Sequence, residues 1–196
     1  MRGKRMGALI SREILTDYLE SITKDQKLKL YLVNQCAPVI KGLKPATMLM
    51  IENQYLLNFY LLAMEWQLEW FLLYGGLKKS AVLLFHSDAL NGYLNQFEVK
   101  QFLKQMGYEQ VLLDDKLRQL GERIGRYHEF NHEYPHELGI FLGYPIGDVL
   151  GFLKQKGEHV LYRGYWNVYC DVEEAKSTFA AFDRAREELI WKLIKE

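Results

Sequence analysis

Tyr134–Gly151 has the sequence YPHELGIFLGYPIGDVLG, and Gly164–Asp171 has the sequence GYWNVYCD. The apolar run Glu137–Leu142 predicts a strand. Pro145 suits the first position of a helix, because its missing N–H has no partner there. Tyr165–Cys170 is rich in aromatic and β-branched residues and predicts the last strand. Together the two stretches predict a strand, a tight turn, a helix and a second strand.

Further elements are predicted on the N-terminal side and after the last strand. Three short apolar runs predict strands at Ala46–Ile51, Leu68–Tyr74 and Ser80–His86, and the last two form a hairpin around a Gly-Gly turn. Capping residues and helical spacing predict helices at Ser11–Ile22, from Thr23 to about Asn34, from about Asn53 to Trp66, at Asp88–Met106 with a break near Gly92, from about Gln110 to Tyr127, from Pro145 to Gly157 and from Val172 onward.

This order of elements predicts the fold class. A hairpin followed by β-α-β segments favours a mixed sheet with helices packed on it. We therefore predict one α+β domain over residues 1–196, with a mixed β-sheet of about five strands and an N-terminal helical segment, residues 1–35, packed on it. A right-handed crossover would set Glu137–Leu142 and Tyr165–Cys170 side by side. Their loops would then share a rim where a cleft forms.

Composition excludes several classes of protein. The chain has 196 residues, 49% of them hydrophobic and 26% charged, which is typical of a globular domain. Its formal net charge of zero argues against binding to nucleic acid, which needs a basic surface. The apolar stretch Tyr55–Tyr74 contains Glu65 and Glu69, so a helix followed by a strand is favoured over a membrane span. Two cysteines, Cys36 and Cys170, are too few for a secreted disulfide scaffold, which predicts a cytoplasmic protein.

Five short motifs are spread along the chain, namely CAP at Cys36–Pro38, GLKPA at Gly42–Ala46, HE at His136–Glu137, FLGYP at Phe141–Pro145 and GYWNVY at Gly164–Tyr169. They resemble the motifs of DUF3793, a family of bacterial domains of unknown function that is common in anaerobic Firmicutes. The likeness extends from about Leu28 to the last helix. Asn167 stands where that family usually has Lys, and Arg163 stands where it often has Cys. The resemblance implies a cytoplasmic bacterial protein and assigns no catalytic residue.

His136 and Glu137 are the candidate catalytic pair. A histidine beside a carboxylate can be held in one tautomer and act as an acid or a base near neutral pH. The structural alternative is that His136 hydrogen-bonds a neighbouring loop while Glu137 pairs with a Lys or Arg. His128 and His132 would share a helix face, as metal-ligand pairs do. A solvated helix end explains them more simply, so we predict no metal site.

The candidate ligand-binding residues lie in the motifs. The GYP turn leads into a helix N-terminus, where backbone N–H groups can bind an anion, although a tight connection would need the same residues. Lys44 lies in a predicted loop, where a lysine can contact an anion or simply be exposed. On a strand, Tyr165 and Tyr169 share one face and Trp166 takes the other; one face packs in the core, and the opposite one can stack a flavin or nucleobase. The candidates are therefore Lys44, Gly143, Tyr144, Pro145, Tyr165, Trp166 and Tyr169.

Three functions remain open from the sequence, and no cofactor is indicated. The favoured one is a protein, associated with neither nucleic acid nor membrane, that binds a small ligand or a protein partner near HELGIFLGYP and GYWNVY. An enzyme that uses His136 and Glu137 predicts a pocket holding both side chains. An interaction module predicts an exposed apolar patch without a pocket, with Phe59, Trp66 or Trp70 on the surface.

Overall fold

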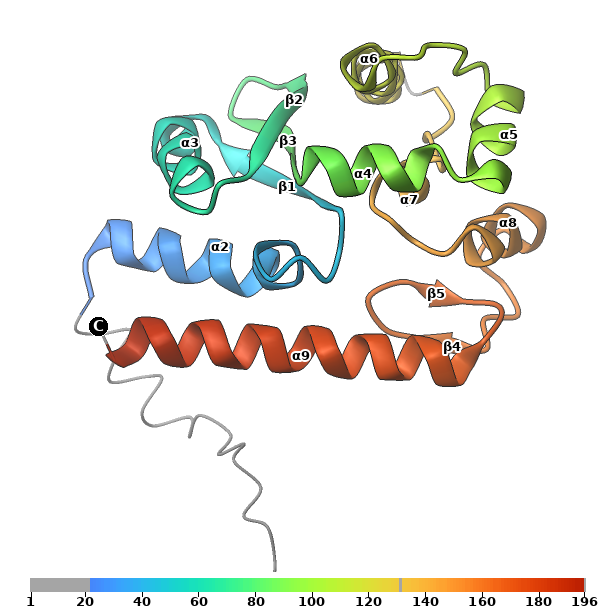
Figure 1. Ribbon diagram of the computed structural model, residues 1–196. Coiled ribbons are helices and arrows are strands. Elements are labelled where there is room, and N and C mark those ends of the chain that lie inside the picture. The colour runs from blue at the N-terminus through green and yellow to red at the C-terminus, as the bar shows by residue number, and fades with distance from the viewer. Residues whose placement is uncertain (1–21, 131, 196) are drawn as a thin grey trace, which may run out of the picture.

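The apolar runs of the N-terminal half form one antiparallel sheet in the computed structural model, which describes residues 22–130 and 132–195 (Figure 1). β3 lies between the other two strands, and its alternate side chains enter the hydrophobic core on opposite faces. Leu83 joins one cluster of buried side chains, whereas Leu84 joins the other. The predicted strands and hairpin are confirmed as β1 (Ala46–Glu52), β2 (Glu69–Gly75) and β3 (Lys79–Phe85).

Helices cover both faces of this sheet. One face is covered by α2 and α3, which bury Cys36 and Phe59 against it. The other face is covered by α4, α5 and α6, which bury Leu90, Phe102 and Leu120. These elements are α2 (Lys24–Ile40), the short 3₁₀ turn η1 (Asn53–Tyr55), α3 (Leu56–Glu65), α4 (Ser87–Leu94), α5 (Phe97–Gln105) and α6 (Leu113–Phe130).

α2 begins with the predicted capping box. Thr23 and Gln26 each accept a hydrogen bond from the backbone N–H of the other. The helix continues past Asn34, its predicted end, and includes Pro38 near its C-terminus. Proline lacks the N–H that a helix interior uses. The side chains around it are buried against the sheet, and this packing extends the helix beyond its predicted end and through a proline.

The C-terminal half corrects the predicted sheet. Glu137–Leu142 does not form a strand: it contains the short helix α7 (Leu138–Phe141). Tyr165–Cys170 contributes β5 (Asn167–Val168), which pairs with β4 (Tyr162–Arg163). The prediction of one mixed sheet of about five strands is therefore wrong, and so is the crossover that was to set these two stretches side by side in it. The described residues contain a three-stranded and a two-stranded sheet, both antiparallel.

The misassigned strand has a physical explanation. Leu138, Ile140 and Phe141 are all buried, as a core strand would be. A short apolar run of this kind does not distinguish a buried strand from a buried helical turn. The turn is set just upstream, where the Pro135 carbonyl accepts a hydrogen bond from the N–H of Leu138. Local turn geometry therefore decides the conformation.

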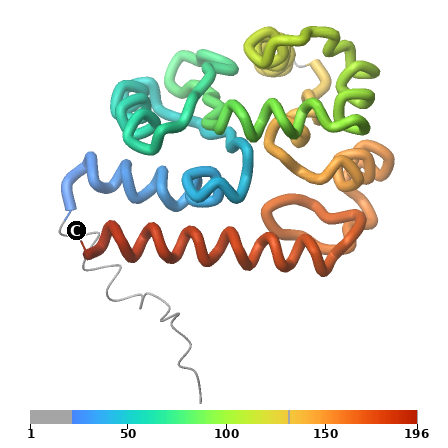
Figure 2. The backbone as a smooth tube through the Cα atoms, viewed as in Figure 1, coloured from blue at the N-terminus to red at the C-terminus, as the bar shows by residue number. Residues whose placement is uncertain are grey.

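The long C-terminal helix contacts α2 and the segment that contains Tyr165, Trp166 and Val168. α9 (Val172–Lys195) packs along α2, and Figure 2 shows the two helices side by side beneath the rest of the chain. Lys41 at the end of α2 forms an ion pair with Glu188 of α9 at 2.6 Å. As predicted, Asp171 caps α9 by accepting a hydrogen bond from the N–H of Glu174 at 3.3 Å. Between α7 and β4 lies α8 (Ile146–Gln155).

Some predicted boundaries shift. The helix predicted at Asp88–Met106 is two helices, α4 and α5, which meet at Asn95 and Gln96 rather than near Gly92. α6 begins at Leu113 and continues to Phe130. Pro145 is the N-cap of α8 and not its first helical residue. The helix predicted at Ser11–Ile22 lies outside the described residues, apart from its last position.

The sequence predicted that Asn53 begins a helix as its capping residue, but its side chain makes other contacts. Its amide donates hydrogen bonds to the carbonyls of Gly76 and Leu77, and it accepts one from the Ser80 hydroxyl. Asn53 therefore ties the β2–β3 turn to the end of β1.

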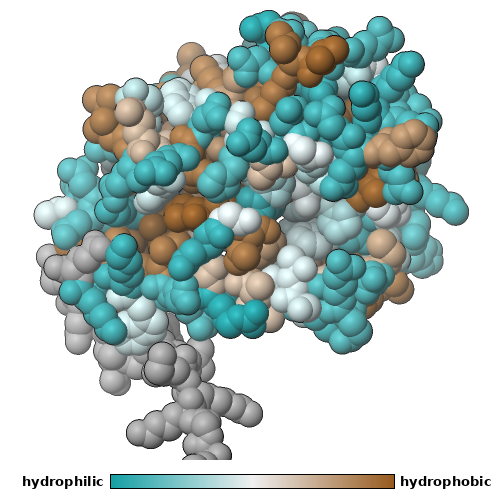
Figure 3. Space-filling model, viewed as in Figure 1, coloured by the Kyte–Doolittle hydropathy of each residue, from teal (hydrophilic) through white to brown (hydrophobic). Residues whose placement is uncertain are grey.

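Hydrophilic side chains cover most of the face drawn in Figure 3, and apolar side chains gather in a band along α2.

Tyr55–Tyr74 contains α3 followed by most of β2, so the predicted helix and strand are confirmed there. Among the described residues, no helix combines the length and the apolar character needed to cross a membrane.

Candidate functional site

Two adjoining cavities lie where the motif segments meet. The smaller encloses about 260 Å³ and the larger about 630 Å³, and Asp148 and Trp166 line both. The smaller cavity is lined mainly by aromatic and aliphatic side chains, among them Tyr134, His136, Leu142, Tyr144 and Phe152. The larger cavity is lined from three separate segments, by residues that include Leu43, Lys44, Gly143, Pro145, Cys170 and Glu174.

The turn at Gly143 brings two of these segments together. Gly143 has a φ of +73°, which favours glycine, and a Cβ there would overlap the ring of Pro45. The turn follows α7 directly, because the N–H of Gly143 donates to the carbonyl of Ile140 at 2.8 Å. The Tyr93 hydroxyl donates a hydrogen bond to the carbonyl of Tyr144. The loop before β1 and the turn before α8 therefore lie in direct contact.

Asp148 holds the third segment in place. Its carboxylate is 4% exposed and accepts hydrogen bonds from the indole N–H of Trp166 at 2.7 Å and the backbone N–H of Tyr169 at 2.7 Å. The backbone N–H of Cys170 donates to the same carboxylate at 3.0 Å. A charged acceptor with several donors is among the stronger hydrogen-bonded groups in proteins. Asp148 thus fixes the GYWNVY loop against α8.

Lys44, Tyr144 and Trp166 form one continuous stack, here called the Lys44 stack. The Lys44 ammonium lies 5.0 Å from the centroid of the Tyr144 ring. The Tyr144 ring stacks on Trp166 at 5.3 Å, with 29° between the planes. Trp166 in turn contacts Phe179 of α9 edge-on at 4.5 Å. Three predicted ligand-binding residues, far apart in the sequence, are therefore neighbours: Lys44 lines the larger cavity, Tyr144 the smaller one, and Trp166 both.

Burial changes the acidity of groups around the Lys44 stack. Desolvation lowers the pKa of Lys44 to about 8, and only the nearby Cys36 opposes this shift. Desolvation raises the pKa of the Cys36 thiol to about 12, so this cysteine is protonated at neutral pH. Lys44 remains mainly protonated at neutral pH and lies close to the point where it loses its charge.

Cys170 also lines the larger cavity and is exposed. Its Sγ is 3.2 Å from an oxygen of Asp148. Desolvation, and then the hydrogen bond to Asp148, raise the pKa of this thiol to about 11. Cys170 is therefore protonated at neutral pH, which makes it a poor nucleophile.

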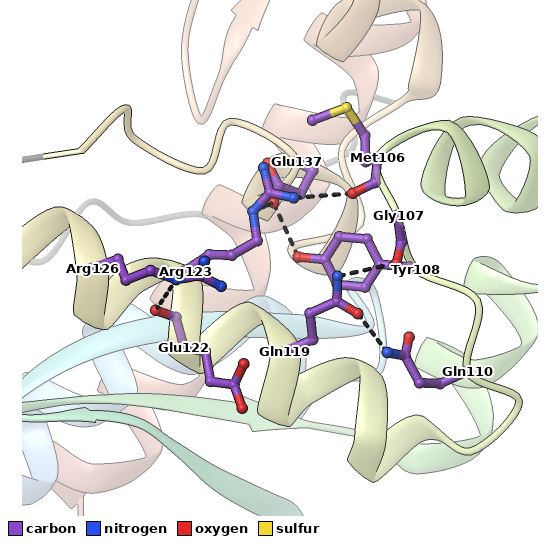
Figure 4. Close-up of polar contacts among 9 residues, drawn as sticks. All are labelled: Met106, Gly107, Tyr108, Gln110, Gln119, Glu122, Arg123, Arg126 and Glu137. Atoms are coloured by element: carbon purple, nitrogen blue, oxygen red, sulfur yellow. Dashed lines mark hydrogen bonds and ion pairs between the residues drawn. The ribbon is translucent and has the colours of Figure 1, made fainter.

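His136 and Glu137 have separate environments. His136 lines the smaller cavity, with its ring 4.9 Å from that of Phe152. Glu137 is fully buried, and its Oε1 lies 2.7 Å from Nε of Arg123 and accepts a hydrogen bond from the Tyr108 hydroxyl at 3.0 Å (Figure 4). Burial and the neighbouring Glu137 raise the pKa of Tyr108. Glu137 thus has the arginine partner of the structural alternative, and neither cavity lining includes it.

The partners of Glu137 belong to a network that the sequence did not indicate. Arg123 also donates to the carbonyl of Met106 at 3.0 Å, and Gln119 donates to the carbonyl of Gly107 at 3.1 Å (Figure 4). These bonds fix α6 against the loop that follows α5. Their residues are far apart in sequence and belong to no motif, so neither spacing nor composition reveals them.

The remaining aromatic candidates point to different neighbours. Tyr165 donates a hydrogen bond to Asp183 at 2.9 Å and packs on Phe179 of α9. Trp166 also contacts Phe179, so the predicted alternation of Tyr165 and Trp166 across a strand does not hold. Tyr169 packs instead against Gly151 of α8. Alternation requires extended backbone, and only two residues of this segment are in a strand.

Two other predictions concern residues away from the cavities. His128 stacks on Tyr74 at 4.7 Å. Among the described residues, no group of three or more His, Cys, Asp or Glu side chains is placed to hold a metal ion. Phe59 is buried, Trp66 and Trp70 are half-buried, and α3 instead exposes Leu57, Leu61 and Met64.

A family model described as "Protein of unknown function (DUF3793)" matches residues 32–196. The chain belongs to the DUF3793 family. No curated protein and no solved structure matches it. The DUF3793 match includes all three segments that line the larger cavity, so the site lies within the family domain.

Proposed function

We propose that this DUF3793 protein binds a small organic ligand in the larger cavity, with an anionic group of the ligand at Lys44. The observation that carries this proposal is the Lys44 stack, which joins three distant segments and has two of its members, Lys44 and Trp166, in the lining of the larger cavity. The cavity volume of about 630 Å³ falls within the range of small-molecule sites, which is roughly 300 to 1,000 Å³.

The charge of Lys44 supports an anionic group. Its side chain is half-buried, and no carboxylate forms an ion pair with it in the described residues 22–130 and 132–195. Partial desolvation disfavours the ammonium form, and a bound anion would restore it. A charge-assisted hydrogen bond of this kind is among the stronger contacts a ligand can make.

The other lining residues of the larger cavity indicate the rest of the ligand. Asp171, Glu174 and Thr178 supply polar groups, and Trp166 and Phe182 supply apolar surface. Carboxylates accept hydrogen bonds from amine or hydroxyl groups. We therefore propose a ligand with an apolar body, an anionic group at one end and a hydrogen-bond donor at the other.

Two features support a binding role in the cytoplasm. The engagement of Glu137 by Arg123 and Tyr108 favours binding over proton transfer by the His136–Glu137 pair. Cys36 and Cys170 are both free thiols, which fits a reducing compartment.

The test starts with small molecules that co-purify with the protein, identified by mass spectrometry. Each is then titrated against the wild type, Lys44→Met and Lys78→Met, with binding followed by calorimetry. Lys78 is an exposed lysine in the β2–β3 turn and serves as the matched control. We expect Lys44→Met to weaken binding about tenfold or more, since it removes a charged partner, and Lys78→Met to leave it unchanged. Equal binding by the wild type and Lys44→Met would refute the proposal.

A further inference from the structure

A separate cavity of about 400 Å³ lies between α5 and the start of α6. It shares no lining residue with the two cavities at Trp166. Three lysines line it: Lys100 and Lys104 from α5, and Lys116 from α6. Glu109 is the acidic residue in its lining.

Lys116 is buried without a counter-ion. It is 5% exposed, and within the part of the chain that the structure describes no ion pair joins it to an acidic side chain. Asp115, its neighbour in sequence, pairs with Arg118 at 2.8 Å instead. Its Nζ lies 3.5 Å from the carbonyl oxygen of Val111, at the outer limit of a hydrogen bond. A buried lysine is normally paired, because removing a charge from water is unfavourable.

The two rim lysines add to this positive charge. Lys100 and Lys104 are exposed, and neither forms an ion pair with a described acidic residue. Burial lowers the pKa of Lys116, and the charge of Lys100 lowers it further. Glu109 is exposed and forms no ion pair with these lysines in the described ranges. The cavity therefore gathers three lysines, two of them exposed and one, Lys116, buried.

Gln110 supplies a second unsatisfied group in the same lining. Its amide N–H donates to Gln119 at 2.5 Å, while Gln119 donates to the carbonyl of Gly107, so both amides have assigned directions (Figure 4). The Oε1 of Gln110 is buried and accepts no hydrogen bond from any described residue. Buried acceptors are normally satisfied, so a donor is missing here.

We infer that this cavity binds a small phosphate monoester that also carries a hydroxyl group. The phosphate lies against Lys116 with Lys100 and Lys104 around it, since lysine binds phosphate as a point charge. The hydroxyl donates to Oε1 of Gln110 after a small movement of that side chain. Lys116 is thus a binding residue whose partner is the ligand.

The test uses glycerol 3-phosphate and methyl phosphate as probes and measures binding by calorimetry on the full chain. Lys116→Met retains the apolar stem and removes the charge. Lys154→Met, at an exposed position in α8, is the matched control. We expect both probes to bind the wild type and Lys154→Met. We expect Lys116→Met to bind neither, and glycerol 3-phosphate to bind about fivefold tighter than methyl phosphate because of its hydroxyl groups.

A second variant keeps the test decisive if Lys116→Met folds poorly. Lys100→Ala combined with Lys104→Ala changes exposed positions and leaves the buried lysine in place. We expect it to weaken glycerol 3-phosphate binding about tenfold. The inference is overturned if neither probe binds the wild type, or if the probes bind it and the lysine variants alike.

Discussion

The sheet region, residues 46–85, and the cavity region, residues 134–171, hold their shape in different ways. In the sheet region β3 is paired along its length on both sides, so backbone hydrogen bonds fix its neighbours. In the cavity region the β4–β5 ladder joins only two residues to two. Its loops are fixed instead by individual side chains, above all Glu137 and Asp148.

This difference shows where the chain tolerates change. A backbone ladder survives the loss of a side chain, because every residue contributes its own N–H and C=O groups. A loop fixed by one carboxylate does not, because several donors lose their acceptor together. Single substitutions at these carboxylates and at Gly143 should therefore disturb the cavity region out of proportion to their size.

The largest effect is expected at Glu137. Glu137→Leu leaves Arg123 and Tyr108 without their shared acceptor, and we expect the free energy of unfolding to fall by about 3 kcal/mol. The neighbouring change His136→Gln should alter it by about 0.5 kcal/mol or less, since His136 makes ring contacts at a cavity wall. Urea denaturation measures both. Equal effects would mean that Glu137 does not fix α7.

The next effect is expected at the turn. Gly143→Ala combines a positive φ with overlap on Pro45, and we expect a loss of about 2 kcal/mol. Gly92→Ala is the control, because a Cβ there meets no atom and the residue lies inside α4. It should stabilise the protein by about 0.5 to 1 kcal/mol, since alanine favours helix. Thermal unfolding measures the stability of both variants. If both substitutions destabilised the protein equally, the positive φ and the contact with Pro45 would not explain the loss at Gly143.

Asp148→Asn tests the loop that carries Trp166. The amide cannot accept from as many donors as the carboxylate, so we expect a loss of about 1 to 2 kcal/mol. The pKa of Cys170, about 11 in the wild type, should fall toward its ordinary value. Alkylation of Cys170 by iodoacetamide at pH 8 should then be faster, whereas Asp115→Asn should leave the rate unchanged. An unchanged rate in Asp148→Asn would show that its carboxylate does not set the reactivity of this thiol.

The smallest effect concerns Lys44 and pH. The pKa of Lys44 is about 8 in the folded chain and has its ordinary value of 10.5 in the unfolded chain. Folding therefore releases a proton from Lys44 between pH 8 and pH 10.5. The penalty for burying the ammonium is full below pH 8 and is lost as the pH rises toward 10.5. Relative to Lys44→Met, the wild type should gain about 1 kcal/mol over this window, allowing for solvent screening of a half-exposed amine. Urea denaturation at pH 7.5, 9 and 10 checks this; a constant difference would contradict it.

The sheet region was predictable because its signals are local. Its three apolar runs and its Gly-Gly turn are each complete within a few residues, and the structure confirms them; so is the capping box at Thr23, which precedes this region. The strand predicted at Glu137–Leu142 failed because buried helix and buried strand have the same composition over so short a run.

The site was predictable in part. Lys44, Tyr144 and Trp166 were singled out from their motifs, and the structure brings them together. The route to that arrangement was wrong, since the segments meet through the Gly143 turn and Asp148 rather than through parallel strands. The partners of Glu137, Arg123 and Tyr108, could not be found from spacing, because the contacts cross between separate elements.

Local sequence signals were enough to predict the antiparallel hairpin, most of the helices and the segments that carry polar and aromatic side chains. Periodicity and turn chemistry act over a few residues, and a single chain displays them directly. The fold alone makes α7 helical, turns Glu137 toward Arg123 instead of a cavity, and buries Lys116 without a counter-ion. Burial and charge pairing depend on which distant segments meet, and no local pattern encodes that.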